Sequence, residues 1–199
     1  MQLSSEKPVL QPAFFYVHTF CSPQELLIMK YLLTFLLMLI SVGSLQAQLT
    51  SFQEKETTLI FVRHAEKADD GTKDPPLNEE GVKRAEVLSK LMTENFSISA
   101  VFSTPYKRTL QTAQPLAEKI GQVVQVYNFT DPGELLNSIK EAHSGSAVLI
   151  VGHSNTTPML VNMLLGAKKY EQLPEDEYGK YFVVQLHPDG AVTDQKLSY

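Results

Sequence analysis

The chain has 199 residues, of which 43% are hydrophobic and 20% charged, with a formal net charge of −5 at pH 7. This length predicts one globular domain with room for an appended segment, and the composition is ordinary for a folded protein. The negative charge and the lack of a basic run argue against nucleic acid as a partner, although local charge alone governs a phosphate pocket.

The N-terminal part has the layout of a secretory signal peptide. Met29-Lys30 begins a short charged region, Leu32–Ile40 is almost continuously apolar, and Leu45-Gln46-Ala47 resembles a cleavage site. The apolar stretch is short for a membrane span. We therefore expect export to the periplasm or medium, with an uncleaved membrane anchor as the alternative.

Three parts of the chain follow from this interpretation. We expect an over-extended gene start or a disordered segment at residues 1–28, a signal peptide at 29–47 and the functional domain at 48–199, with no membrane association after cleavage. Translation would then start at Met29. The single cysteine, Cys21, lies upstream, so the mature chain would have no disulfide, no thiol chemistry and no cysteine-based metal site.

Strands and helices are predicted to alternate along the rest of the chain. Apolar or alternating runs predict strands at Leu59–Val62, Ala100–Ser103, Val123–Tyr127 and Ala147–Val151. Helical spacing predicts helices from the N-cap Asn78 to about Glu94, from near Pro105 to Gly121, over Pro132–His143, and over Thr156–Leu165 with Gly166 as the stop. Tyr181–Leu186 and Ala191–Leu197 predict a terminal hairpin.

This alternation predicts an α/β fold. We expect a three-layer α/β/α sandwich around a mostly parallel sheet, without internal repeats. Pro115 lies inside the second helix and should bend or divide it, because proline removes one backbone donor and crowds the preceding turn.

Four charged or titratable residues follow strand ends, where ligands bind in open α/β sheets. Arg63 and His64 follow the first strand, Arg108 comes after the second, and His153 follows the last. We predict that His64 attacks phosphorus, because a neutral imidazole can hold a phosphoryl group covalently. Arg63 and Arg108 would clamp the phosphoryl oxygens, and His153 would donate a hydrogen bond to them near the N-terminus of the Thr156 helix.

Structural roles are the alternatives for each of these side chains. An isolated histidine often caps a strand, and an arginine often forms a surface ion pair. A metal site is disfavoured, since the five histidines show no metal-ligand spacing and no carboxylate lies at a matching offset.

Three segments carry a resemblance to a known family. Arg63–Lys67, Ser103–Thr109 and Gly152–Thr156 are similar to the signature segments of the histidine phosphatase superfamily, in the branch of phosphoglycerate mutases and small phosphohistidine-phosphatase-like proteins. The resemblance runs from about Thr57 to the C-terminus. It implies a phosphoglycerate mutase-like fold, the same four roles for Arg63, His64, Arg108 and His153, and no metal or organic cofactor.

The leaving group needs a proton donor, for which the sequence offers two candidates. In larger members of the family a Glu or Asp supplies it, often from an inserted segment that this chain lacks. Asp131 is the first candidate and Glu134 the second, with an N-cap role as the alternative for Asp131. A leaving group of low pKa would need little acid assistance. Glu66 and Lys67 border the nucleophile and would either touch substrate or be solvated loop charges.

A compact chain with a signal-like segment favours hydrolysis of a small phosphorylated substrate over a glycolytic mutase. We expect loops 68–76 and 170–178 to rim the pocket, and the acidic residues of the second loop to disfavour highly phosphorylated substrates. Two alternatives stay open. One is a phosphohistidine-protein phosphatase in signalling, and the other is a non-catalytic phosphate-binding module on the same fold.

Overall fold

The computed structural model describes residue 24, residues 27–38 and residues 55–199. The chain divides into two compact units, Met1–Gln53 and Glu54–Tyr199. In the first unit residues 27–38 are helical and exposed. Across the described ranges, no helix has both the length and the apolar character needed to cross a bilayer. The predicted cleavage site and the domain boundary at residue 48 lie outside the described residues.

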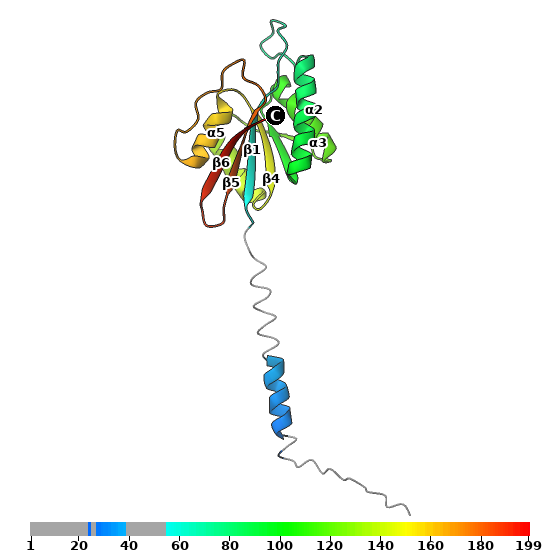
Figure 1. Ribbon diagram of the computed structural model, residues 1–199, viewed down its shortest axis with the longest axis vertical. Helices are drawn as coiled ribbons and strands as arrows, with labels where there is room; N and C mark the ends of the chain where they lie inside the picture. Colours follow the sequence, from blue (N-terminus) through cyan, green and yellow to red (C-terminus); the bar gives the residue numbers. More distant parts are fainter. Residues whose placement is uncertain (1–23, 25–26, 39–54) are drawn as a thin grey trace, which may run out of the picture. The chain divides into compact units, whose positions relative to one another are not determined.

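A six-stranded sheet forms the centre of the second unit (Figure 1). In spatial order it runs β3-β2-β4-β1-β5-β6. The four strands from β3 to β1 are parallel to one another, whereas β5 pairs antiparallel with both β1 and β6. The predicted mostly parallel sheet is therefore confirmed. The strands are β1 (Thr57–Arg63), β2 (Ile98–Ser103), β3 (Val124–Val126), β4 (Ala147–Gly152), β5 (Lys180–Leu186) and β6 (Val192–Ser198).

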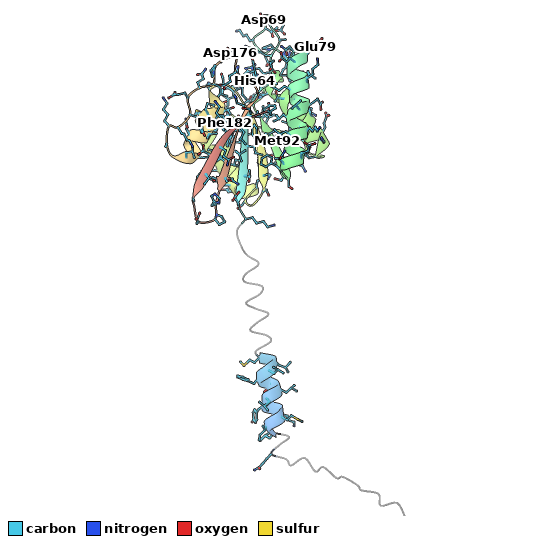
Figure 2. All side chains as sticks on the ribbon, viewed as in Figure 1. His64, Asp69, Glu79, Met92, Asp176 and Phe182 are labelled. Atoms are coloured by element: carbon cyan, nitrogen blue, oxygen red, sulfur yellow. The ribbon has the colours of Figure 1, made fainter. Side chains whose placement is uncertain are left out.

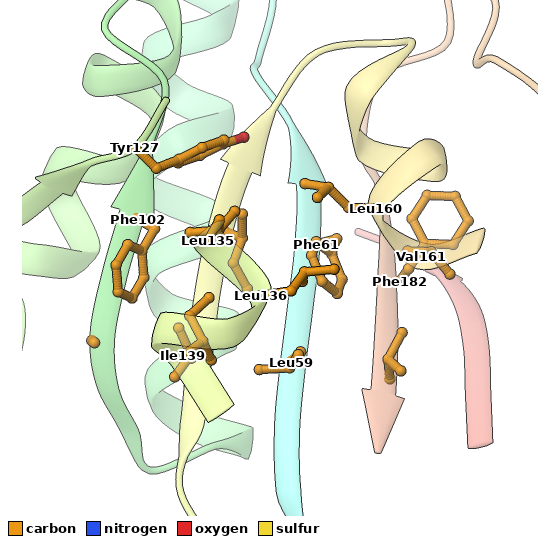
Figure 3. Packing of buried hydrophobic residues seen from close by; sticks show 14 of the residues in the cluster. Leu59, Phe61, Phe102, Tyr127, Leu135, Leu136, Ile139, Leu160, Val161 and Phe182 are labelled. Carbon is orange, nitrogen blue, oxygen red and sulfur yellow. The ribbon is translucent and has the colours of Figure 1, made fainter. Parts of the chain in front are cut away.

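Helices cover both faces of this sheet, as the three-layer prediction requires. Two of them, α2 and α3, pack on one face, and α4 and α5 pack on the other (Figures 1 and 3). The chain thus folds into the predicted α/β/α sandwich. The helices are α2 (Glu79–Asn95), α3 (Lys107–Lys119), α4 (Pro132–Ala142) and α5 (Thr156–Leu165).

The central strand β1 shows why the sequence forms three layers. Its side chains alternate between faces, so Leu59 and Phe61 join the core with α4 and α5, while Ile60 and Val62 join the core with α2 and α3. All four side chains are fully buried. Burial of each contributes about 1.5–3 kcal/mol, which explains the continuous apolar run of a strand covered on both faces.

Helix ends agree with the predicted capping residues. The Asn78 side chain caps α2 by accepting a hydrogen bond from the Gly81 amide at 2.8 Å. Gly166 ends α5 in the left-handed conformation, with φ of 64°. The Asp131 carboxylate caps α4 by accepting from the Glu134 amide at 3.0 Å. Asp131 therefore has the N-cap role that the sequence offered as the alternative to a catalytic acid.

Of the two outcomes expected for Pro115, division of the second helix is wrong. Helix α3 runs without division through Pro115. The residues around the proline, Ala113, Leu116 and Ala117, are fully buried in the core against the sheet. Their packing outweighs the roughly 3 kcal/mol that an interior proline costs, because tertiary contacts supply most of the stability of a helix in a protein.

The start of α2 passes very close to the loop that follows β1. The Asn78 amide donates to the Glu66 carbonyl at 3.0 Å, and a Cβ atom built on Gly81 would lie 2.1 Å from the same oxygen. Only glycine fits this position without a shift of the backbone. The contact links the helix to the segment that carries His64.

We predict that Gly81→Ala destabilises the protein by about 1–3 kcal/mol, the usual cost of overpacking. Urea denaturation of the wild type and the variant measures this difference. Gly133→Ala is the matched control, because its Cβ would lie an ordinary 3.6 Å from the nearest atom and alanine favours a helix. Equal stability of Gly81→Ala and the wild type would contradict the close approach.

Candidate active site

The ends of β1, β2 and β4 meet at one edge of the sheet, as predicted. Arg63 on β1 lies opposite Gly152 on β4, so His64 and His153 follow from adjacent positions. The His64 amide also donates to the Gly152 carbonyl at 2.9 Å. Figure 2 shows His64 at this edge, toward the same end of the second unit as Asp176.

A pocket of about 390 Å³ opens at this edge. It is a polar pocket with cationic, imidazole and aromatic groups, as an oxyanion site requires. Its lining residues are His64, Lys67, Tyr106, Arg108, Phe129, His153, Ser154, Asn155, Thr156, Gln172 and Glu175.

His64 is held in one tautomer. Its Nδ1 atom lies 2.7 Å from the Ala65 carbonyl oxygen, which only accepts, so Nδ1 carries the proton and Nε2 has a free lone pair. Burial lowers the pKa of His64 to about 3, and the positive charges of Arg63 and Arg108 act in the same direction, against the opposing effect of the Ala65 hydrogen bond. The ring is therefore neutral at physiological pH and suited to nucleophilic attack.

His153 faces His64, with ring centroids 5.5 Å apart. Its Nδ1 atom lies 3.4 Å from Nη2 of Arg108, which only donates, so Nδ1 is the acceptor and the proton is on Nε2. Burial, followed by the charges of Arg108 and Arg63, lowers the pKa of His153 to about 4. In this geometry the ring orients Arg108 and has no free N–H to offer a phosphoryl oxygen.

A chain of buried hydroxyl groups fixes the His153 ring. Nε2 of His153 lies 3.0 Å from the Thr104 hydroxyl, and that hydroxyl lies 2.8 Å from the Thr109 hydroxyl. Thr109 in turn donates toward the carbonyls of Thr104 and Tyr106. Both threonines are fully buried. The Thr109 hydroxyl donates to carbonyls, so the Thr104 hydroxyl donates to Thr109 and accepts from Nε2–H of His153, which agrees with the tautomer given above.

Arg63 is engaged differently from the prediction of a simple phosphate clamp. Nη1 donates to the carbonyls of Pro174 and Glu177 at 2.6 and 3.1 Å. Nη2 donates to the carbonyl and the carboxylate of Glu175 at 2.9 and 3.2 Å. Its Nε–H is buried without a partner among the described residues. Arg63 therefore holds the loop before β5 and retains one unused donor.

Arg108 is more accessible than Arg63. Its side chain is 15% exposed, it lines the pocket, and its guanidinium lies 4.6 Å from the centre of the Tyr106 ring. Asp74 approaches it at 3.5 Å from the loop after β1. Arg108 is thus positioned between an aromatic face and His153, with its charge directed into the pocket.

Glu66 and Lys67 have separate environments. Glu66 is buried, and its carboxylate accepts from Nε of Arg84 at 2.7 and 2.8 Å. It does not line the pocket, so the structure gives it neither the substrate contact nor the solvated position expected. Lys67 does line the pocket. Asp131 and Glu134, the proposed acids, are absent from the lining and meet in the α4 cap.

Sequence reasoning missed several contributors. Thr104 lies inside a signature segment, where a hydroxyl next to a catalytic loop could have been noted. Ser154 donates a hydrogen bond to Glu175. The Tyr178 ring lies against the Arg63 guanidinium. Glu175 was expected only as one of the acidic residues of the 170–178 loop at the pocket rim. No local signal marks its contact with Arg63, because 112 residues separate them in the chain.

No group of three or more His, Cys, Asp or Glu side chains in the described ranges is arranged to hold a metal ion.

A family model described as "Histidine phosphatase superfamily (branch 1)" matches residues 59–129. The matched range contains the first two signature segments, and the β1–β4 register places the third, Gly152–Thr156, beside the first. The chain is therefore similar to the histidine phosphatase superfamily over these residues. The family model supports the resemblance over residues 59–129, and the phosphoglycerate mutase-like fold is confirmed. A search of curated proteins found no match.

Solved structures of the superfamily share this fold at low sequence identity. The protein histidine phosphatase SixA, complexed with tungstate, has a TM-score of 0.58 at 19% identity, over 71% of this chain and 96% of its own. The mycobacterial glucosyl-3-phosphoglycerate phosphatase has a TM-score of 0.59 at 14% identity, over 73% and 99%. A phosphoserine phosphatase mutant from Entamoeba histolytica, complexed with phosphoserine, has 0.56 at 16%, over 70% and 95%.

The lowered pKa of His64 makes stability depend on pH. The folded chain keeps His64 neutral down to about pH 3, whereas the unfolded chain protonates it below the ordinary value of 6.5. Since the unfolded state binds more protons in this window, stability falls as the pH falls, by about 1.4 kcal/mol per unit for this residue.

We predict that the wild type loses about 2 kcal/mol more stability than His64→Asn between roughly pH 6.5 and pH 5. Urea denaturation of both proteins at the two pH values measures the difference. Asparagine removes the titration and can still donate to the Ala65 carbonyl. Parallel pH dependence in the two proteins would show that His64 is not held neutral by the fold.

Proposed function

We propose that this histidine phosphatase hydrolyses phosphomonoesters through a phosphohistidine intermediate on His64. The observation that carries the proposal is the Nδ1 hydrogen bond to the Ala65 carbonyl at 2.7 Å, because it leaves Nε2 unprotonated in a buried, cationic pocket. A neutral imidazole in such a site can attack phosphorus and then release phosphate to water. Nothing in these steps requires a metal or an organic cofactor.

Phosphate recognition falls to Arg108, Arg63 and His153. Arg108 offers its guanidinium directly to the pocket, and the buried Nε–H of Arg63 is a second donor without a partner in the described chain. A bound dianion favours a doubly protonated His153, whose Nδ1–H then becomes a donor to the phosphoryl oxygens. The N-terminus of α5, at Asn155 and Thr156, adds its dipole.

A second candidate function is hydrolysis of phosphohistidine on proteins. The SixA likeness favours it, since that protein is named a protein histidine phosphatase and nearly all of its length aligns with this chain. The phosphoimidazole leaves more readily than an alcohol and needs less acid assistance. This function in signalling requires a cytoplasmic chain, so cellular location separates the two candidates.

We also propose that the protein is exported. The layout of residues 29–47 supports this, and the described part of that segment, from residue 29 to 38, is helical and apolar. An h-region of this kind inserts into the secretion machinery and is then removed. A phosphomonoesterase outside the cytoplasm would release phosphate from small esters there.

We predict that the protein recovered from its host lies outside the cytoplasm and begins at Gln48. Cell fractionation and N-terminal sequencing measure the two properties. A variant with Leu33, Leu36 and Leu37 changed to Asn should stay in the cytoplasm with its N-terminus intact, because the apolar region is lost. Cytoplasmic wild-type protein would overturn export and favour the signalling phosphatase.

We predict that the wild type hydrolyses an aryl phosphate in EDTA and that His64→Ala loses at least about a thousandfold in kcat, because no covalent intermediate can form. The control is His187→Ala, in the turn between β5 and β6, which should retain full activity. Mass spectrometry under basic quenching should detect the phosphoenzyme in the wild type alone. If all three proteins are inert, the non-catalytic binding module is the better reading.

A further inference from the structure

The proposed function leaves the source of the leaving-group proton open. The Asp131 carboxylate accepts from the Glu134 main-chain amide in the cap of α4, and neither residue lines the pocket. A different carboxylate does. Among the residues that line the pocket, Glu175 is the one acidic side chain.

Glu175 is held in place from two strand ends. Its Oε1 atom accepts from the hydroxyl of Ser154, the residue directly after His153, at 2.7 Å. Its Oε2 atom accepts from Nη2 of Arg63 at 3.2 Å, directly before His64. The two residues that fix the carboxylate are thus the immediate sequence neighbours of the two pocket histidines, and the carboxylate lines the same pocket as both rings.

The main chain of this residue is fixed as well. The carbonyl of Glu175 accepts from Nη2 of Arg63 at 2.9 Å, and the carbonyls on either side, of Pro174 and Glu177, accept from Nη1. The side chain nevertheless remains 69% exposed. A carboxylate held by its neighbours and open to water can act on a substrate and then exchange its proton with solvent.

We propose that Glu175 is the general acid and general base of the reaction, a role that rests on the proposed phosphohistidine mechanism. In this role the carboxyl carries a proton when the leaving oxygen departs, and its exposed position lets it exchange that proton with water. Ser154 keeps its bond to Oε1 in both states.

In the first step His64 Nε2 attacks phosphorus, the P–N bond forms and the P–O bond to the leaving group breaks. The proton of the Glu175 carboxyl passes to the leaving oxygen, so the alcohol departs neutral. In the second step water attacks phosphorus and gives a proton to the Glu175 carboxylate. The P–N bond breaks, its electron pair returns to Nε2, and inorganic phosphate leaves with the acid form restored.

The test compares leaving groups in the full-length chain. Glu175→Gln keeps an acceptor for Ser154 but cannot supply a proton. We expect this variant to lose about a hundredfold or more in the first-turnover rate with an alkyl phosphate, the usual contribution of a general acid. With 2,4-dinitrophenyl phosphate the first turnover should change only a few-fold, because this leaving group departs as an anion.

A second signature belongs to the base role. With 2,4-dinitrophenyl phosphate, Glu175→Gln should release one equivalent of phenolate and then accumulate the phosphoenzyme, since the attacking water has lost its base. Asp176→Asn is the matched control. It removes the adjacent acidic residue, which does not line the pocket, and should behave as the wild type with both substrates.

Two results would overturn the proposal in distinguishable ways. Suppose that the wild type is active and that Glu175→Gln loses the same rate with both leaving groups. That result would contradict the proton-transfer role of Glu175 and leave the phosphohistidine mechanism standing. The same conclusion follows if the variant binds vanadate more tightly and turns over normally, because Glu175 then only competes with phosphate for Arg63. A wild type inert with both substrates would instead remove the phosphohistidine mechanism on which the role depends.

Discussion

Arg63 carries a positive charge into the interior with only 2% of its side chain exposed. An isolated buried charge costs several kcal/mol, so the chain must supply partners for the guanidinium. It supplies the carbonyls of Pro174, Glu175 and Glu177, the Glu175 carboxylate, and the face of the Tyr178 ring at 4.3 Å. Satisfying this one charge therefore orders a wall of the pocket contributed by a distant part of the chain.

The partners of Arg63 also explain the electrostatics of the pocket. Carbonyl groups satisfy most donors of Arg63 without cancelling its charge, whereas the carboxylates of Glu175 and Asp74 offset part of the charge of Arg63 and Arg108. At His153 the two guanidinium charges still outweigh the two carboxylates. Burial in such a site lowers the pKa values of His64 and His153 to about 3 and about 4. The same arrangement thus suits an anion and keeps the His64 ring unprotonated, whereas an exposed histidine with a pKa near 6.5 would be partly protonated at neutral pH.

Features that depend on local pattern could be predicted from the sequence. The buried alternation of β1, the Asn78 cap and the Gly166 stop follow from short-range rules. The meeting of Arg63, His64, Arg108 and His153 follows because parallel strands bring their carboxyl ends to one edge. These predictions need only the neighbouring residues and the direction of each strand, which is the information that the sequence carries directly.

Features that depend on distant partners could not. Nothing near Glu66 indicates that Arg84, 18 residues later, turns its carboxylate away from the pocket. Local rules predict a break at Pro115, yet the helix continues because the side chains around the proline are buried against the sheet. In both cases the deciding energy comes from tertiary packing, which a local rule does not include.

The loop that carries Glu175 is anchored well beyond its contact with Arg63. At its start, the side chain of Asn162 accepts from the amides of Lys169 and Tyr170. Asp194, whose side chain is 8% exposed, binds the Lys169 ammonium and the Tyr170 hydroxyl. At its end, Gly179 adopts φ of 68° and its carbonyl accepts from the Tyr199 amide at 2.9 Å.

With both ends of this loop fixed to β5, β6 and α5, the wall has little freedom to act as a lid. The position of the carboxylate is then set by the scaffold before substrate arrives, and such preorganisation is what makes fixed charges and donors effective in a transition state.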